Sequence, residues 1–441
     1  MSRLTRTAAI GTYALVLCGA AAWAQAPAAP TFAEAVEVRV VNLEVVVTAG
    51  GERVTGLGPG DFKLEVDGRE VPIDYFTEVR EGRADAPAAG VTAVPAVTAG
   101  EAVGTRYLVF IDDFFAVPTH RNQVLRALRD DLPRLAEEDR MAIVAFDGRG
   151  LDLLSGWSGS REELDAALGR AMDRTAYGLR RLSELRRFSF SAAHEGRRPH
   201  GGAYSARSSF STIGFFGAGR ESAAPDLQPV HEITTQVGRA VRAAAAALRG
   251  FATVPGRRVM LVLAGGWPAF STEWGHSLPG DSAADPRATS PRERYEVFDP
   301  LVDAANGLGY TLYPVDLQPY AGLRSRGADV GSAGEAYLAS AQRDRLDADS
   351  RDALAYLARA TGGRAFEGSA GRSALERVAE DVRSYYWLGF APFWQGEGAA
   401  HRVRVEPRRK GHRARSRRGF TDLLDEPATG QLMSERLEIE P

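Results

Sequence analysis

The hydrophobic and polar positions divide the chain into three parts. From residue 36 to 80, apolar residues alternate with polar ones, a period-two pattern that predicts β-strands. The alternation shifts by one position between Val40 and Val41, which indicates a bulge or a strand that changes sheets. Two turn signals, Gly50-Gly51 and Asp67-Gly68, predict two hairpins in this part.

The second part, from 105 to 383, alternates short apolar runs with stretches of helical periodicity. Four runs are apolar enough to be strands buried on both faces: 106–112, 140–147, 257–266 and 309–316. Strands alternating with helices predict an α/β fold, a doubly wound and mostly parallel sheet with both faces covered. The loops that follow parallel strands meet along one rim, where such sheets bind ligands.

After Arg383 the pattern returns to β. An aromatic strand, "SYYWLGFAPF", is followed by "HRVRVEP" and "HRARSRRGF", which flank "RRKG" and predict a hairpin. Neither flank alone has enough strands to close a core, so we expect the N- and C-terminal β segments to pair into one β-sandwich with the α/β domain inserted between them.

These patterns set the expected domain boundaries. They are a signal peptide at 1–26, an N-terminal β segment at 27–81, a linker at 82–104, an α/β domain at 105–383 with insertions at 173–228 and 267–291, and a C-terminal β segment at 384–441.

The N-terminus has the features of an export signal. Arg3 and Arg6 precede an apolar stretch, and Ala22-Trp23-Ala24 fits a cleavage site, so we expect a periplasmic or extracellular protein. The alternative is an uncleaved anchor, which would be the chain's one route to membrane association. The single cysteine, Cys18, lies inside this segment, which leaves no disulfide, cysteine nucleophile or thiolate metal site elsewhere.

Composition and charge exclude several functions. A net charge of −3 over 441 residues does not suit binding to nucleic acid by charge. The basic run 402–418 predicts a solvated strand face, with binding to anionic envelope polymers or lipid headgroups as the alternative. The seven histidines lack metal-ligand spacing, and neither a Gly-x-Ser-x-Gly elbow nor a phosphate-binding glycine loop occurs. We therefore expect a protein that is not an enzyme.

The candidate site lies where three buried strands end. Its residues are those that follow these strands: Asp112, Asp113, Phe114, Phe115, Asp147, Gly265, Gly266 and Trp267. Two readings of the acids stay open. Asp112, Asp113 and Asp147 could hold a residual divalent cation, since Ca²⁺ accepts irregular oxygen cages. Alternatively, Asp112 caps the following helix, while Asp113 faces water or pairs with Arg121. The aromatic residues after these strands form an exposed partner-binding patch, or else the insertions bury them. They are Phe114, Phe115, Trp267, Phe270 and Trp274.

The segments "YLVFIDD", "RMAIVAFD", "RRVMLVLAGG", "GYTLYPVD" and "LAYLARATGGRAFEGS" resemble a von Willebrand factor type A domain. The whole chain is similar to the VWFA-related proteins of the exported acidobacterial type. The resemblance implies a metal-ion-dependent adhesion site with Asp-x-Ser-x-Ser after the first strand and a further Asp after a later one. Here Phe114 and Ala116, or Phe115 and Val117, replace the serines, and Gly265 and Gly266 replace the second acid.

The resemblance therefore implies a degenerate adhesion site without a cofactor. We expect a binding, adhesion or scaffolding module that contacts a protein partner in the cell envelope. The alternative is a module or hydrolase that depends on a divalent metal and uses Asp112, Asp113 or Asp147.

Overall fold

The structure, a computed structural model, describes most of the chain beyond residue 39. The described ranges are 40–86, 99–180, 228–252, 256–269, 293–317, 333–367, 373–392, 399–421 and 437–438, with no side chains described at 228–230, 293, 333–346, 367 and 437–438. All of them belong to one compact unit, 39–441. The expected signal peptide, and most of both expected insertions, lie outside the described residues.

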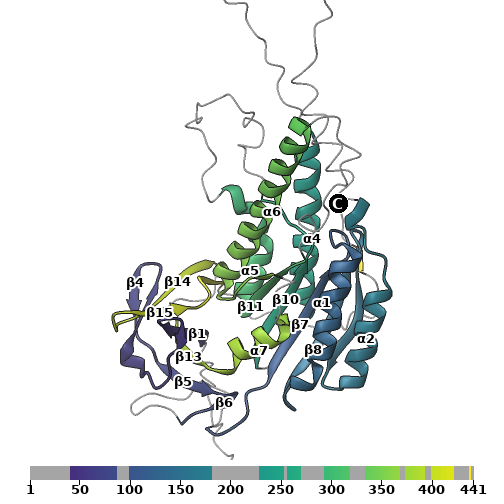
Figure 1. Cartoon of the computed structure of the whole chain (residues 1–441). Helices are drawn as coiled ribbons and strands as arrows, with labels where there is room; N and C mark the ends of the chain where they lie inside the picture. The colour runs from purple at the N-terminus through teal and green to yellow at the C-terminus, as the bar shows by residue number, and fades with distance from the viewer. Residues whose placement is uncertain are drawn as a thin grey trace, which may run out of the picture. The chain divides into compact units, whose positions relative to one another are not determined.

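A seven-stranded sheet forms the α/β part, in the order β12-β11-β10-β7-β8-β9-β17 (Figure 1). Its strands are β7 (Thr105–Asp112), β8 (Arg140–Phe146), β9 (Gly150–Ser158), β10 (Arg257–Ala264), β11 (Tyr310–Asp316), β12 (Phe366–Glu367) and β17 (Leu437–Glu438). The strands from β12 to β8 are parallel to their neighbours, whereas β9 is antiparallel to β8 and β17 to β9. The mixed sheet agrees with the expected α/β class, but β9 was not predicted, because its apolar residues follow no regular period.

Helices cover both faces of this sheet. The first set is α1 (Pro118–Asp130), α2 (Arg161–Asp173) and α7 (Ala374–Arg383), and the second is α4 (Gln228–Gly250), α5 (Asp299–Gly307) and α6 (Ala333–Thr361). Each set shares a buried core with the strand residues of one face. Alternate residues of β7 go to opposite cores, so Phe110 packs with the second set and Val109 with the first. Short 3₁₀ turns lie at Pro59–Asp61, Leu132–Arg134 and Glu293–Phe298.

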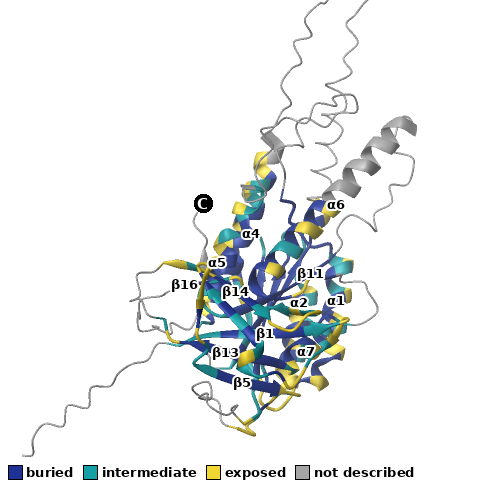
Figure 2. Cartoon of the chain, turned by 90° about the vertical axis from the view of Figure 1, so that its left-hand side faces the viewer, coloured by how far each residue is buried: buried dark blue, intermediate teal, exposed yellow. Residues whose placement is uncertain are grey.

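The remaining strands form two antiparallel sheets that mix both ends of the chain. The first contains β15 (His412–Arg415), β1 (Val41–Ala49), β13 (Tyr385–Phe390), β5 (Tyr75–Arg80), β6 (Arg83–Ala84) and, beside β1, β2 (Glu52–Arg53). The second contains β16 (Gly419–Thr421), β14 (Ala400–Pro407), β3 (Phe62–Val66) and β4 (Arg69–Val71). Residues from both sheets share one core, with Leu43, Phe62, Tyr386 and Val405 among its buried members (Figure 2).

The register joins the N-terminal flank directly to the C-terminal one. Val41 pairs with Phe390 across β1 and β13, and Leu64 pairs with Val405 across β3 and β14. The flanks therefore complete each other, as the shortage of strands in each predicts.

Turn positions explain where the N-terminal hairpins lie. Gly50 and Gly51 have φ values of 62° and 94°, and Asp67 and Gly68 have φ values of 50° and 80°. Positive φ at both central residues suits a two-residue hairpin turn, and the strands on either side pair as predicted.

The predicted C-terminal hairpin holds only in part. The end of "HRARSRRGF" forms β16, whose Gly419 and Phe420 pair with β14, whereas its start forms β15, which pairs with β1 in the other sheet. Within the expected linker 82–104, Arg83 pairs with Arg80 in β5 and forms a bridge to Ala102. The middle of this linker, 87–98, lies outside the described residues.

Candidate functional site

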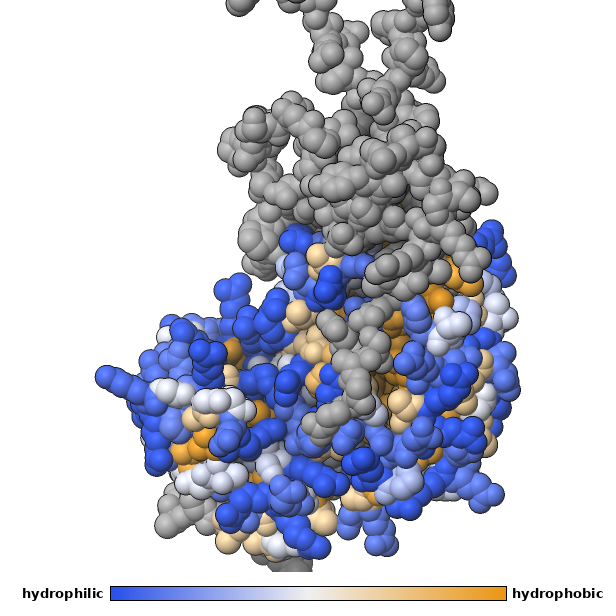
Figure 3. Space-filling model, viewed as in Figure 1, coloured by the Kyte–Doolittle hydropathy of each residue, from blue (hydrophilic) through white to orange (hydrophobic). Residues whose placement is uncertain are grey.

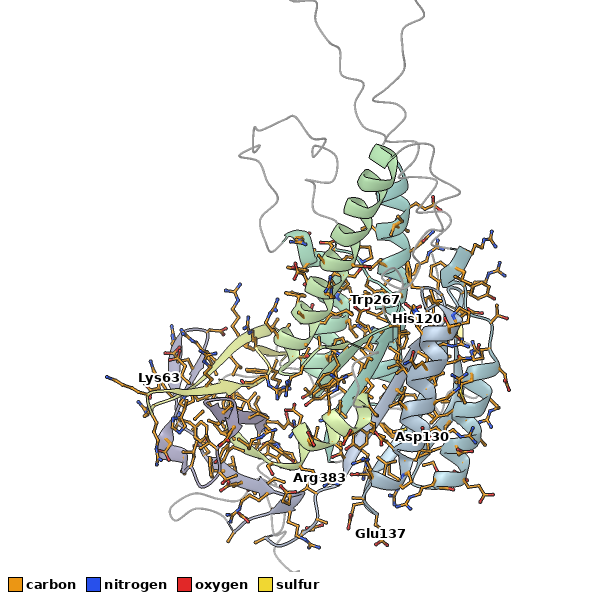
Figure 4. The ribbon with its side chains drawn as sticks, viewed as in Figure 1. Lys63, His120, Asp130, Glu137, Trp267 and Arg383 are labelled. Carbon is orange, nitrogen blue, oxygen red and sulfur yellow. The ribbon has the colours of Figure 1, made fainter. Side chains whose placement is uncertain are left out.

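The candidate site lies at the carboxyl ends of β10, β7 and β8, which are neighbours in the sheet. Asp112 pairs with Phe146, and Ile111 with Leu263, so the three strands end side by side. The residues after them form three adjacent loops, which we call the rim: 113–117, 147–149 and 265–269. In Figure 4, Trp267 and His120 lie at this end of the sheet, and Asp130 and Glu137 lie at the other. The sequence-predicted site residues are thus brought to one edge.

Asp112 is fully buried and fully engaged by donors of the protein. Its Oδ1 accepts hydrogen bonds from the backbone N–H groups of Phe114 (3.0 Å) and Phe115 (3.2 Å). Its Oδ2 accepts a hydrogen bond from the indole Nε1 of Trp267 at 2.7 Å. Burial raises the pKa of Asp112 to about 7, against the lowering effect of these donors. Asp112 therefore organises the rim loops; it does not cap α1, which begins at Pro118.

Asp113 is fully buried and forms an ion pair with two arginines. Arg121 Nη1 lies 2.6 Å from Oδ1, and Arg174 Nε lies 2.6 Å from Oδ2. Arg174 also pairs with Asp152 at 2.7 Å, so two guanidinium groups face two carboxylates. Burial raises the pKa of Asp113, while both guanidinium groups act to lower it. Arg121 and Arg174 therefore supply the positive charge beside Asp113.

The sequence predicts only one of the two arginines that pair with Asp113. The pairing of Asp113 with Arg121 is one of the interpretations of the sequence given above, and the structure confirms it. Arg174 follows α2 and comes from the start of an expected insertion, so no spacing in the sequence indicates it. Arg121 also donates to the carbonyls of Met172 (3.0 Å) and Arg174 (2.9 Å), which fixes that segment beside Asp113.

Glycines allow the first rim loop to be packed from three sides. A Cβ at Gly265 would lie 2.4 Å from the carbonyl oxygen of Phe115, and one at Gly178 would also lie 2.4 Å from that oxygen. A Cβ at Gly148 would lie 2.2 Å from the ring of Phe114. These contacts are too short for any other residue without movement of the backbone or ring. Gly265, directly after β10, therefore serves close packing.

The aromatic residues of the rim are mainly interior. Trp267 has no exposed surface and Phe115 has 3 %, while Phe114 is half-buried against Phe146. The two alternatives for these residues were an exposed patch and a buried cluster, and burial holds for Trp267 and Phe115. Phe270 and Trp274, expected in the same cluster, lie outside the described residues.

Asp147 is a turn residue rather than a partner of the other two acids. Its Oδ1 accepts hydrogen bonds from the N–H groups of Arg149 (2.8 Å) and Gly150 (2.9 Å), which closes the connection from β8 to β9. Among the residues that the structure describes, no group of three acidic, histidine or cysteine side chains is placed to hold a metal ion.

Several arginines of the basic run in the C-terminal flank form ion pairs with carboxylates of the same strands and their neighbours. Arg404 pairs with Glu406, Arg408 with Glu70 and Arg409 with Asp61, at 2.5, 2.6 and 2.8 Å. On the face shown in Figure 3, the surface of these flanking strands is mainly hydrophilic. This arrangement favours a solvated strand face over an anion-binding strip.

Comparisons with known proteins give distant matches. No family model and no curated protein matches the chain. Among solved structures, an aerotolerance-related membrane protein from Bacteroides fragilis is 11 % identical, covers 63 % of this chain and 98 % of its own, and has a TM-score of 0.29. The open form of the pilus adhesin SpaC from Lactobacillus rhamnosus GG is 10 % identical, covers 81 % of this chain and 47 % of its own, and has a TM-score of 0.28. At these identities and TM-scores the matches carry no argument about function, which is therefore argued from the chain's own geometry.

No helix in the described part of the chain combines the length and apolarity needed to cross a bilayer.

Proposed function

We propose that this protein is an exported binding module. It binds a protein partner through the rim of its α/β sheet, and this binding requires no divalent cation. The proposal combines the von Willebrand factor type A resemblance with the observed strand order, in which the direction of winding changes between β10 and β7. Open α/β sheets bind their ligands beside this position, at the carboxyl ends of the strands.

One observation carries the cation-independent part of the proposal. Both carboxylate oxygens of Asp113 are held by guanidinium groups, and both oxygens of Asp112 are held by N–H donors. A cation would have to displace Arg121, Arg174 or Trp267 from buried contacts. Displacing a buried guanidinium from its carboxylate costs several kcal/mol, about 3–5. The acids are thus better suited to holding the loops in shape than to ligating a metal.

The expected role is adhesion or scaffolding in the envelope rather than catalysis. The signal-like N-terminus supports export, and the ion pairs of Arg404, Arg408 and Arg409 argue against a nucleic-acid partner. Three exposed residues on or beside the rim are available for contact: Thr119, Arg149 and Leu179, the last with 51 % of its surface exposed. Leu179 follows Gly178, whose N–H donates to Ala116 in the first rim loop at 3.0 Å.

Calorimetry tests whether the rim needs a metal. We expect titration of the full chain with Mg²⁺, Ca²⁺ or Mn²⁺ to give no heat of specific binding, because the acids already have partners. Asp113→Asn is the matched variant, since it removes the charge but keeps the shape. Saturable binding to the wild type that is lost in this variant would support the metal-dependent alternative instead.

Site-specific cross-linking tests the rim as the contact surface. A photo-reactive amino acid is placed at Leu179 or, as a control, at the exposed Glu137 near the opposite end of the sheet. With envelope extract, we expect a discrete adduct from position 179 that is absent from position 137 and is unchanged by a chelator. Equal products from both positions, or loss of the adduct with chelator, contradicts the proposal.

A further inference from the structure

The seven-stranded sheet has an open stretch of edge directly beside the rim. β9 begins at Gly150, immediately after the rim loop 147–149. The carbonyl of Gly150 accepts a hydrogen bond from the N–H of Asp147 at 3.4 Å, so it faces β8. The backbone groups of successive strand residues point to alternate sides, so those of Leu151 and Leu153 face away from β8. The first part of β9 therefore presents N–H and C=O groups at the edge of the sheet.

This open stretch is short because β9 is protected further along. Its pairing with β8 shifts register after Leu153, which is a bulge. The carbonyl of the next residue, Leu154, accepts a hydrogen bond from Nη2 of Arg170 at 2.6 Å. Bulges and charged side chains are both ways in which proteins keep an edge strand from pairing with other chains. Pairing with a further strand is thus confined to residues 151–153.

The C-terminal segment of the chain lies on this edge. β17 is antiparallel to β9, with Leu437 opposite Leu151 and Glu438 opposite Gly150. Of the strands in the described part of the chain, β17 is the one that pairs with this side of β9, and it is two residues long. A strand this short adds few hydrogen bonds, so its contact opens at a low cost in free energy. The edge is occupied by a segment that another strand can replace.

The sequence of this segment suits the surface beside the edge. From Arg436 to Glu440, charged and apolar residues alternate, a period-two pattern that favours a strand. Three of the six residues from 435 to 440 are glutamates. Beside the edge, Arg149 and Arg170 are exposed, and Leu153 has 45 % of its surface exposed. An acidic strand with alternate apolar residues therefore matches both the charge and the apolar surface at this place.

We propose that residues 151–153 form a docking site for short acidic strands, and that the C-terminal segment 435–440 is the tethered ligand of this site. Main-chain hydrogen bonds to an exposed edge supply affinity, and alternate side chains supply specificity. Because the segment belongs to the same chain, its effective concentration at the edge is high, and any free strand must compete with it. The segment thus regulates access to the sheet edge beside the rim.

A synthetic peptide of residues 432–441, carrying a fluorophore, tests the proposal by anisotropy. It is titrated with the full-length wild type and with full-length Leu437→Pro, whose own segment loses a backbone donor and cannot pair. A tethered copy at about 1 mM effective concentration weakens a peptide of about 100 μM affinity roughly tenfold. We therefore expect the peptide to bind Leu437→Pro about tenfold more tightly than wild type. The same peptide with Leu437→Pro should bind neither chain.

Charge reversal tests whether the site selects acidic strands. Arg149→Glu, added to the Leu437→Pro chain, should weaken binding of the peptide about threefold. Arg126→Glu makes the same change at an exposed position of α1 and is the matched control, which should leave the affinity unchanged. Equal effects of the two reversals would contradict the assigned place of the peptide.

Hydrogen exchange tests the occupancy of the edge without any peptide. The amide of Leu151 should exchange more slowly in wild type than in Leu437→Pro, while that of Val144 in β8 stays protected in both and shows that the sheet is intact. Equal exchange at Leu151, equal affinity of the peptide for the two chains, or binding of the proline peptide overturns the proposal. A wild type that dimerises with concentration, when Leu437→Pro does not, also overturns it, because the segment would then dock on a second copy.

Discussion

At the scale of single residues, the rim shows how two adjacent acids reach different states. Asp112 and Asp113 are neighbours in sequence and both are fully buried. Asp112 accepts from neutral N–H groups, whereas Asp113 is bound by two guanidinium groups. The difference arises because successive residues at the end of a strand point to opposite sides of the sheet.

Arg121→Met should destabilise the protein by about 3 kcal/mol, since it leaves the Asp113 carboxylate with one of its two buried partners. Urea unfolding measures the change in the free energy of unfolding. Arg129→Met is the control, because Arg129 forms an exposed pair with Asp165 that water and salt screen, so its loss should have a much smaller effect. Equal changes in the free energy of unfolding would mean that the buried pair contributes no more to stability than the exposed pair.

Asp112→Asn should change how stability depends on pH. Burial raises the pKa of Asp112 to about 7, while an unfolded chain has an aspartate pKa of about 3.9. The folded state therefore binds more protons between these values, and this residue's contribution to stability falls as the pH rises from about 4 to about 7. The upper bound on the change is about 4 kcal/mol.

The measurement is the difference in unfolding free energy between wild type and Asp112→Asn over this pH range. We expect the wild type to lose stability relative to the variant with rising pH. Asp130→Asn, at an exposed position, serves as the control. A difference that does not vary with pH would show that Asp112 has the same pKa in both states.

At the scale of elements, the loop after β7 is defined by glycines from two other segments. Gly265 follows β10 and Gly178 follows α2, and both approach the carbonyl of Phe115. The rim loop is thus held by backbone packing in addition to its hydrogen bonds.

Gly265→Ala should destabilise the protein by about 1–3 kcal/mol, because its Cβ would lie 2.4 Å from the backbone oxygen of Phe115, so the backbone must shift. Gly169→Ala is the matched control: it lies in α2 with no atom within 4 Å of its Cβ, and alanine there should stabilise by up to about 1 kcal/mol. Thermal unfolding of both variants gives the comparison. An unchanged melting temperature for Gly265→Ala would mean that the loop shifts to accommodate the Cβ at no cost in stability.

The sequence predicts regular elements well and the contacts of the rim only partly. Period-two and helical patterns locate β7, β8, β10, β11 and most helices because burial dictates those patterns. The pairing of Asp113 with Arg121 follows from their short separation. The hydrogen bond from Trp267 to Asp112 and the ion pair from Arg174 join residues far apart in sequence, so only the folded sheet reveals them. The pairing of β15 with β1, which the predicted C-terminal hairpin does not include, has the same cause, since β1 lies near the other end of the chain.

At the scale of the whole molecule, the two flanks form one structure and the α/β domain is inserted between them. Arg417 binds the carbonyls of Asn306 in α5 and Asn42 in β1, and so links all three parts. The N-H of Arg418 donates to Ala360 of α6 at 3.1 Å.

Removal of residues 384–441 should unfold the N-terminal flank, because β1 and β3 would lose their partners β13, β15 and β14. Hydrogen exchange measures this: amides of residues 41–80 should lose protection, while those of β7 and β10 keep it. A shorter deletion, 422–441, is the control, since it leaves every strand of both flanking sheets in place. Protection of 41–80 in the longer deletion would show that the front flank folds alone.

The pairing of β1 with β13 also sets an order of events during synthesis. Val41 leaves the ribosome long before Phe390, its partner. At about 5–20 residues per second, the first strand waits on the order of 20 to 70 seconds for the residues that complete its sheet. Throughout that time its backbone donors and acceptors are open to pairing with other chains. The nascent chain therefore exposes an unpaired strand edge until its last strands emerge. A chain whose synthesis stops before residue 385 would keep this edge exposed and would be prone to aggregate.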